Sequence, residues 1–229
     1  MKRIGYTIIP IVLFLSESAF TTRDDKCPLL MVPATPGVCI DQFEWPNRPG
    51  VKPKLGLSGV LEDYDRDSKD ILDAERLCRS VGKRVCTAEE WIAACEGANH
   101  SKYPFGDDLP KYDLGQNNGL CNYDKFYIGV DEYLVFKRDP EHMRELDQSE
   151  PAGSRKTCRS LSGAYDMVGN AEEWVRCENG REGWCLASRF WAEPRSCRAL
   201  VATHSPRWHY YDTSTRCCLD VKKVKKENK

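Results

Sequence analysis

Cysteine is the residue type in this sequence with the most chemical potential, since the chain has twelve cysteines in 229 residues. Thiols at that density either form disulfides or bind metal ions. Zinc modules need repeated Cys-x2-Cys pairs or several histidines, but the chain has no such pair and only four histidines. The even number therefore favours six disulfides, which require an oxidising compartment outside the cytosol.

The first residues of the chain meet that requirement. Lys2 and Arg3 precede an apolar run over 8–15, and small residues follow within 16–19. This pattern predicts a signal peptide over residues 1–19, because the apolar run is too short for an ordinary membrane span. A retained signal anchor is the alternative. We expect a secreted or periplasmic protein, without stable membrane insertion after cleavage, that ends in a basic tail over 221–229.

Other reactive side chains show no recognisable spacing. His100, His142, His204 and His209 do not form a metal-binding pattern, and the motifs G-x-S-x-G and H-E-x-x-H and a phosphate-binding glycine loop are missing from the sequence. The 34 basic and 35 acidic residues nearly cancel. That balance argues against a nucleic-acid partner, because such surfaces carry a basic excess.

Two helices and many short strands must position these residues. Apolar residues three and four apart predict a helix over 70–81. Thr87 and Glu90 form a capping box, which predicts a second helix that ends at Gly97. Short strand-like pieces and turns fill most of the remaining chain, and a helical turn is expected within 139–150. The sequence therefore predicts an α+β domain with little regular structure and many disulfides.

Three sequence blocks stand in order along the chain. They read G-K-R-V-C-T-A-E-E-W at 82–91, Y-P-F-G-D at 103–107 and G-A-Y-D-M-V-G-N-A-E-E-W at 163–174. Together they resemble the formylglycine-generating enzyme family, also called sulfatase-modifying factors, and the resemblance runs from about residue 31 to 219. It implies an irregular, C-type-lectin-like α+β domain, which we place at 27–220.

The resemblance implies a structural calcium ion at the third block. Its ligands would be Gly169, Asn170, Ala171 and Glu173, whose carbonyl and carboxylate oxygens suit calcium. Asn122 falls where the family has a second calcium site. The alternative is a plain turn in which Glu173 binds backbone amides.

The resemblance also implies two disulfides, Cys78–Cys217 and Cys95–Cys197, each joining a helix to the closing strands. The other pairs are assigned by proximity alone: Cys27–Cys39, Cys86–Cys218, Cys121–Cys158 and Cys177–Cys185.

Active members of the family bind copper(I) through two cysteines beside a substrate groove, and soft thiolates suit that ion. In those members the cysteines follow a G-G-S-[WY] strand, and the corresponding stretch here is S-R-F-W-A-E-P-R-S-C at 188–197. If Trp191 matches the aromatic residue, Glu193 stands where the first thiol belongs, and Cys197 is already assigned to a disulfide. We therefore expect neither copper nor a catalytic cysteine pair.

Arginine and aromatic residues gather in the closing third of the chain. These side chains are frequent contact residues because they bury much area while offering hydrogen-bond donors. We expect a non-catalytic domain that binds an extended peptide, a protein or a glycan in the family groove. Two alternatives stay open: the aromatic residues only pack on the domain, or the chain is a divergent formylglycine-generating oxidoreductase acting on protein cysteine or another oxygen-using enzyme. The residues are Arg189, Trp191, Arg195, Arg207, Trp208, His209, Tyr210 and Tyr211.

Overall fold

The computed structural model describes residues 27–61 and 72–221. The expected signal peptide and residues 222–229 of the basic tail lie outside the described residues. In chain order the elements are β1 (Met31–Thr35), β2 (Val38–Asp41), α1 (Ala74–Ser80), β3 (Arg84–Val85), α2 (Ala88–Glu96), the 3-10 turn η2 (Gly97–Asn99), α3 (Glu132–Phe136), α4 (Pro140–Leu146), β4 (Glu172–Arg181), β5 (Trp184–Ala187), β6 (Thr213–Thr215) and β7 (Cys217–Asp220).

Two small sheets carry the fold. The first has the order β1-β2-β7-β3, and all its neighbours are antiparallel. The second has the order β5-β4-β6, in which β4 pairs antiparallel with β5 and parallel with β6. The parallel pairing of β4 with β6 is possible because the long stretch between β5 and β6 gives the chain room to cross over.

Both predicted helices form, and side-chain caps begin them. Asp73 accepts a hydrogen bond from the backbone N–H of Arg76 at 2.7 Å at the start of α1. At the start of α2 the Thr87 hydroxyl accepts from the Glu90 N–H at 3.3 Å, while the Glu90 carboxylate accepts from the Thr87 N–H at 2.8 Å. The predicted capping box is thus confirmed, and α2 ends before Gly97, which has a φ of 62°.

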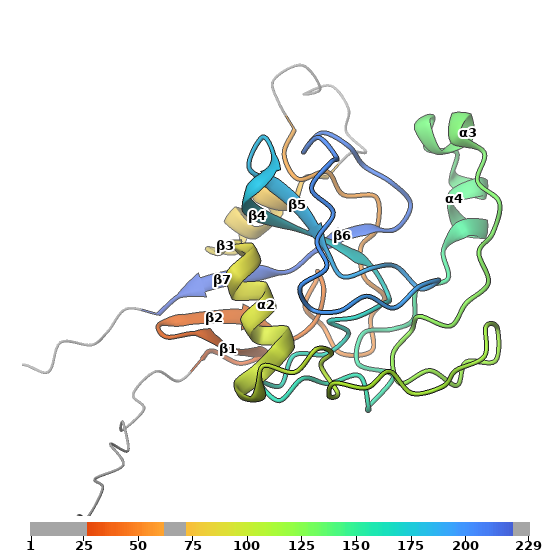
Figure 1. Cartoon of the computed structure of the whole chain (residues 1–229). Coiled ribbons are helices and arrows are strands. Elements are labelled where there is room, and N and C mark those ends of the chain that lie inside the picture. The colour runs from red at the N-terminus through yellow and green to blue at the C-terminus, as the bar shows by residue number, and fades with distance from the viewer. Residues whose placement is uncertain (1–26, 62–71, 222–229) are drawn as a thin grey trace, which may run out of the picture.

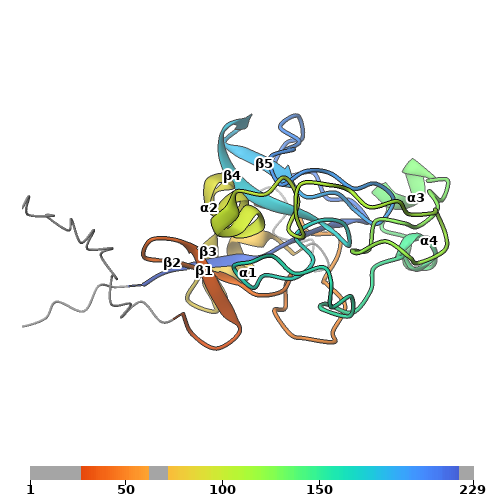
Figure 2. The same ribbon diagram turned by 60° about the horizontal axis from the view of Figure 1, so that its bottom comes forward.

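Two further short helices are present: α4 lies within 139–150, where the sequence predicts a helical turn, whereas α3 precedes that stretch and was not predicted. Asp131 caps α3, and Asp139 followed by Pro140 begins α4. Figures 1 and 2 show this pair at the opposite end of the molecule from the β1–β2 hairpin. Within the described ranges, no helix has the length and apolar character needed to cross a membrane.

Tryptophans fill the interior between the elements. Trp91, Trp174, Trp184 and Trp191 are all fully buried. Trp174 stands edge-on to Trp184 at a centroid distance of 6.0 Å, and its indole N–H donates to the carbonyl of Leu57 at 2.8 Å. A buried indole needs such an acceptor, so this contact fixes the ring as well as filling space.

Six disulfides hold the domain together, and they join the same pairs as those expected from the sequence. Two of them connect adjacent residues of β7, Cys217 and Cys218, to α1 and to the residue after β3. The pairs are Cys27–Cys39, Cys78–Cys217, Cys86–Cys218, Cys95–Cys197, Cys121–Cys158 and Cys177–Cys185.

Candidate functional site

Every cysteine of the chain is part of a disulfide, and no free thiol remains. The copper(I) site of active family members uses two thiolates, so the cysteines of this protein do not fit that ion. Cys86 and Cys218 also lie near Glu90. They form no metal site, because the two sulfurs are bonded to each other and Glu90 caps α2.

The stretch that corresponds to the family's copper-binding segment has other contacts. Cys197 is bonded to Cys95. Glu193, which the resemblance aligns with the first thiol if Trp191 matches the aromatic residue, lies 3.3 Å from the guanidinium of Arg189. This stretch therefore contains an ion pair and a disulfide-bonded cysteine.

The predicted calcium ligand Glu173 has protein partners instead. Arg216 Nε donates to Oε2 and Arg216 Nη2 donates to Oε1, both at 2.8 Å, and Trp91 Nε1 donates to Oε2 at 2.7 Å. Both charged side chains have an exposed fraction of 0%. A guanidinium already supplies the positive charge here, so this arrangement does not fit Glu173 as a calcium ligand. Within the described part of the chain, the donors to Glu173 are these side chains and not the backbone amides of the alternative.

Three of the other predicted ligands do lie together. Gly169 packs so closely on the carbonyl of Asn122 that a side chain there would collide with it. Asn170 accepts a hydrogen bond from Asn122 Nδ2 at 2.9 Å and donates one to Glu44 Oε1 at 2.8 Å. The buried atoms Asn122 Oδ1 and Glu44 Oε2 have no hydrogen-bond partner among the residues that the structure describes. Burial and the nearby Asp166 charge raise the pKa of Glu44 well above its usual value, which favours its neutral form.

A continuous row of rings crosses the closing third of the chain. His204 stacks on Trp208 at a centroid distance of 3.9 Å, and Trp208 stacks on Tyr210 at 4.9 Å. Tyr210 contacts Tyr211 at 4.7 Å, and Tyr211 contacts Trp191 at 5.9 Å. We call these five residues the aromatic ladder. Its first rings are partly exposed, whereas Tyr211 and Trp191 are buried. Trp191 therefore packs against Tyr211 in the interior and is not accessible to a ligand.

Two buried acids lie near the ladder. Glu172 accepts a hydrogen bond from Arg189 at 3.0 Å, whereas the buried Asp212 Oδ1 has no hydrogen-bond partner within residues 27–61 and 72–221. Burial and the neighbouring Glu172 charge raise the pKa of Asp212. Burial and the charge of Arg189 lower the pKa of His204, so its ring is neutral near pH 7. The sequence patterns gave no role to His204 and did not single out Asp212, because the charged groups that shift their pKa values, Arg189 and Glu172, come from other segments of the chain.

Arg195, Arg207 and His209 were also predicted as contact residues, but they are not rings of the ladder and have other contacts. Arg195 comes within 4.0 Å of Glu193, and Arg207 forms an ion pair with Glu182 at 2.9 Å on the β4–β5 hairpin. The His209 ring contacts the backbone carbonyl of Arg207. Trp208 and Tyr210 of the predicted set are themselves partly exposed rings of the ladder. The charge of Arg189 acts on the His204 ring.

A cavity of about 850 Å³ lies between α3–α4 and residues 53–55, with Tyr211 of the ladder in its wall. We call it the α3–α4 pocket. It draws on three segments that are distant in sequence, so no local motif indicates it.

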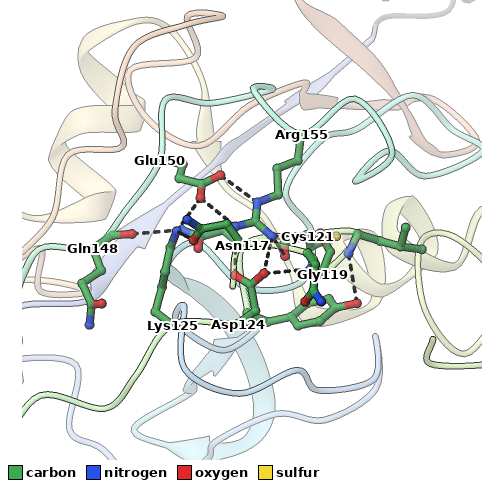
Figure 3. Close-up of polar contacts among 12 residues, drawn as sticks. Asn117, Gly119, Cys121, Asp124, Lys125, Gln148, Glu150 and Arg155 are labelled. Carbon is green, nitrogen blue, oxygen red and sulfur yellow. Dashed lines mark hydrogen bonds and ion pairs between the residues drawn. The ribbon is translucent and has the colours of Figure 1, made fainter. Parts of the chain in front are cut away.

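Arg155 fixes the base of the chain segment that carries α3 and α4. Figure 3 shows its guanidinium between the carboxylates of Asp124, which precedes the segment, and Glu150, which follows it. The two distances are 2.9 and 2.7 Å, and Lys125 also binds Glu150 at 2.7 Å. Burial would raise the pKa of Glu150, but hydrogen bonds from Arg155 and Lys125 outweigh it and lower the pKa to about 2.

Comparison with known proteins supports the family resemblance. The family model described as "Sulfatase-modifying factor enzyme 1-like domain" matches residues 70–202. A search of curated proteins gave no match.

Several solved structures share features of the fold at low sequence identity. The crystal structure of CarF is 14% identical, with a TM-score of 0.49, over 81% of this chain and 87% of that chain. PvdO from Pseudomonas aeruginosa is 15% identical, with a TM-score of 0.46, over 80% of each chain. Treponema denticola variable protein 1 is 18% identical, with a TM-score of 0.37, over 60% of this chain and 47% of that chain.

The match to the family model covers more than half of the 229 residues, and it includes α1, α2 and the third sequence block. The chain therefore belongs to the family of sulfatase-modifying factor enzyme 1-like domains, with the irregular α+β fold of the formylglycine-generating type.

Proposed function

We propose that this protein is an exported, non-catalytic member of the family that binds a ligand. The observation that carries the proposal is the pairing of all twelve cysteines in disulfides. The oxidase chemistry of active members needs two thiolates for copper(I). Here one matching position holds Glu193, and Cys197 is bonded to Cys95. Disulfides at this density also support export, because reducing compartments do not maintain them.

The aromatic ladder is the surface that best suits a ligand. His204, Trp208 and Tyr210 offer stacked rings at the surface, and Arg189 supplies a guanidinium nearby. Flat ring faces bury much area at a small cost in conformational entropy. The ladder is therefore suited to an extended peptide, a protein loop or a glycan, each of which can lie across several rings.

Catalysis is tested by incubating the purified mature protein with a Cys-x-Pro-x-Arg peptide, copper and oxygen. Mass spectrometry of the peptide follows the loss of the thiol. We expect the peptide to stay unmodified. Conversion of the cysteine to an aldehyde would replace this proposal with the divergent oxidoreductase.

Ligand binding is tested on peptide and glycan arrays with the intact protein, a Trp208→Ala variant and a Leu161→Ala control. Leu161 is an exposed apolar residue outside the ladder. Leu161→Ala therefore controls for the loss of an apolar side chain from the protein surface. We expect Trp208→Ala to lose array signals that the control keeps. Equal signals from all three proteins would leave the ladder as packing alone.

A further inference from the structure

The α3–α4 pocket has an apolar floor. Leu55, Met143 and Tyr211 line it, and all three pack in the same hydrophobic cluster as the buried Trp191. The volume of about 850 Å³ falls within the range of small-molecule sites, which are mostly apolar with a few directed polar groups. The floor is therefore suited to hold the apolar part of a ligand.

The lining of the same pocket is strongly cationic. Lys54, Lys137 and Arg144 line it together with Arg138, whereas Asp147 is its single acidic residue. The Asp147 carboxylate is already neutralised by Lys52, at a distance of 3.1 Å. The pocket therefore carries an excess of positive charge, although the whole chain has a formal net charge of −1.

Three of these cations have no acidic partner among residues 27–61 and 72–221. Lys137 lies over the rings of Tyr133 and Phe136, at 5.8 and 5.7 Å from their centroids. Arg144 donates only to the backbone carbonyl of Pro140, at 3.1 Å, and the ammonium of Lys54 has no ion pair. Elsewhere many cationic side chains are paired, for example Arg84, Arg155, Arg176, Arg189, Arg198 and Arg216.

We propose that the α3–α4 pocket binds an amphipathic anion, with a phosphate or carboxylate head among Lys54, Lys137 and Arg144 and an apolar body on Leu55 and Met143. Cationic side chains bind such heads through charge-assisted hydrogen bonds. The ligand could be a free amphiphile or the headgroup region of an anionic lipid, since both present this chemistry. The proposal goes beyond the ladder-based function and does not depend on it.

The test titrates the purified protein with monomeric dodecyl phosphate by calorimetry, and with vesicles of phosphatidylcholine with and without phosphatidic acid by flotation. Inorganic phosphate is the probe without an apolar body. We expect saturable binding of dodecyl phosphate that weakens as salt is added, and much weaker binding of inorganic phosphate. Binding of the monomer assigns a free amphiphile. Binding only to vesicles with phosphatidic acid assigns an anionic lipid.

The decisive variant is Lys54→Gln combined with Arg144→Gln. Both changes keep an uncharged polar side chain at exposed positions, so the fold should persist, which a melting curve checks. The matched control is Lys111→Gln with Arg181→Gln, which removes the same charge outside the pocket. We expect affinity to fall about tenfold in the first variant and to be unchanged in the control. No binding of either probe, or equal loss in both variants, would overturn the proposal.

Discussion

Arg216 and Glu173 form a two-pronged ion pair in the fully buried interior, with both joining distances at 2.8 Å. Two more donors of the same guanidinium reach the backbone carbonyls of Asp41 and Tyr165, at 3.1 and 2.9 Å. The pair thus connects β4, the end of β2 and the junction of β6 with β7. Arg216 thus supplies a fixed positive charge beside the carboxylate that the family resemblance assigns to a calcium ion.

Removal of calcium should leave the melting temperature unchanged. Arg216 neutralises Glu173 without a metal ion, so chelation removes no contact of that carboxylate. Calorimetric melting in millimolar calcium and in chelator gives the comparison. A clear rise of the melting temperature with calcium would restore the predicted site, with Asn122 and Asn170 as its remaining candidates.

Replacement of Arg216 by Gln should strongly destabilise the domain. The Glu173 carboxylate would then remain buried without its charge partner, and breaking a buried pair in this way costs about 3–5 kcal/mol. Denaturant unfolding measures the change. Arg181→Gln, at an exposed arginine, is the control and should change the unfolding free energy little. A comparable result for both variants would contradict the role given to the pair.

Asp166 should make the protein less stable as the pH rises from about 4 to about 6. Burial is the main cause that raises the pKa of Asp166 from 3.8 to about 6. The folded state therefore keeps a proton that the unfolded state loses, and the unfolding free energy falls across that window. Asp166 has a φ of 57°, which Asn tolerates.

Asp166→Asn should consequently reduce the fall of the unfolding free energy between about pH 4 and pH 6, as measured by denaturant unfolding at several pH values. Asp108→Asn, at an exposed position, should leave the fall of the unfolding free energy unchanged. Parallel pH profiles for Asp166→Asn and the native protein would refute the assignment.

Ionised Glu150 should stabilise the folded protein, and this stabilisation should be lost as the pH falls. Its pKa is lowered from 4.5 to about 2 by Arg155 and Lys125, which outweigh burial. Its stabilising contribution is therefore fully present above about pH 4.5 and is lost as the pH falls through about 2. Glu150→Gln should be less stable than the native protein at neutral pH, and the two unfolding free energies should converge near pH 2. A gap of constant size would show that the charge is not responsible.

The long disulfide should matter more than the short one. Cys78 and Cys217 are 139 residues apart, whereas Cys177 and Cys185 are eight apart. The loop-entropy model gives about 5 kcal/mol for the first and about 2.5 kcal/mol for the second. Double alanine variants of each pair, compared by denaturant unfolding, should differ in that order. The reverse order would show that local packing outweighs chain entropy.

The sequence predicts the parts of this fold that depend on neighbouring residues. The helix from Asp73 and the capping box of Thr87 and Glu90 are set within one turn, so local spacing was enough to find them. The family resemblance supplied two of the disulfides, since the cysteines on α1 and α2 stand at positions that some members share.

Contacts between distant segments could not be read from the sequence in the same way. Arg216 reaches Glu173 from 43 residues away, and nothing near the third sequence block reveals the guanidinium. The sequence predicts most members of the aromatic ladder but not their order, because Trp191 meets Tyr211 from twenty residues earlier in the chain. The α3–α4 pocket needs residues 53–55, α3–α4 and Tyr211 together, which only the folded chain provides.

The position of β7 also sets an order for biosynthesis. Cys217 and Cys218 are among the last residues of the domain, yet their partners, Cys78 and Cys86, are made far earlier. While the ribosome is still at work, those two early thiols have no correct partner and must avoid pairing with each other or with later cysteines. The two bridges that tie β7 to α1 and to the residue after β3 can therefore form only after nearly the whole domain has been synthesised.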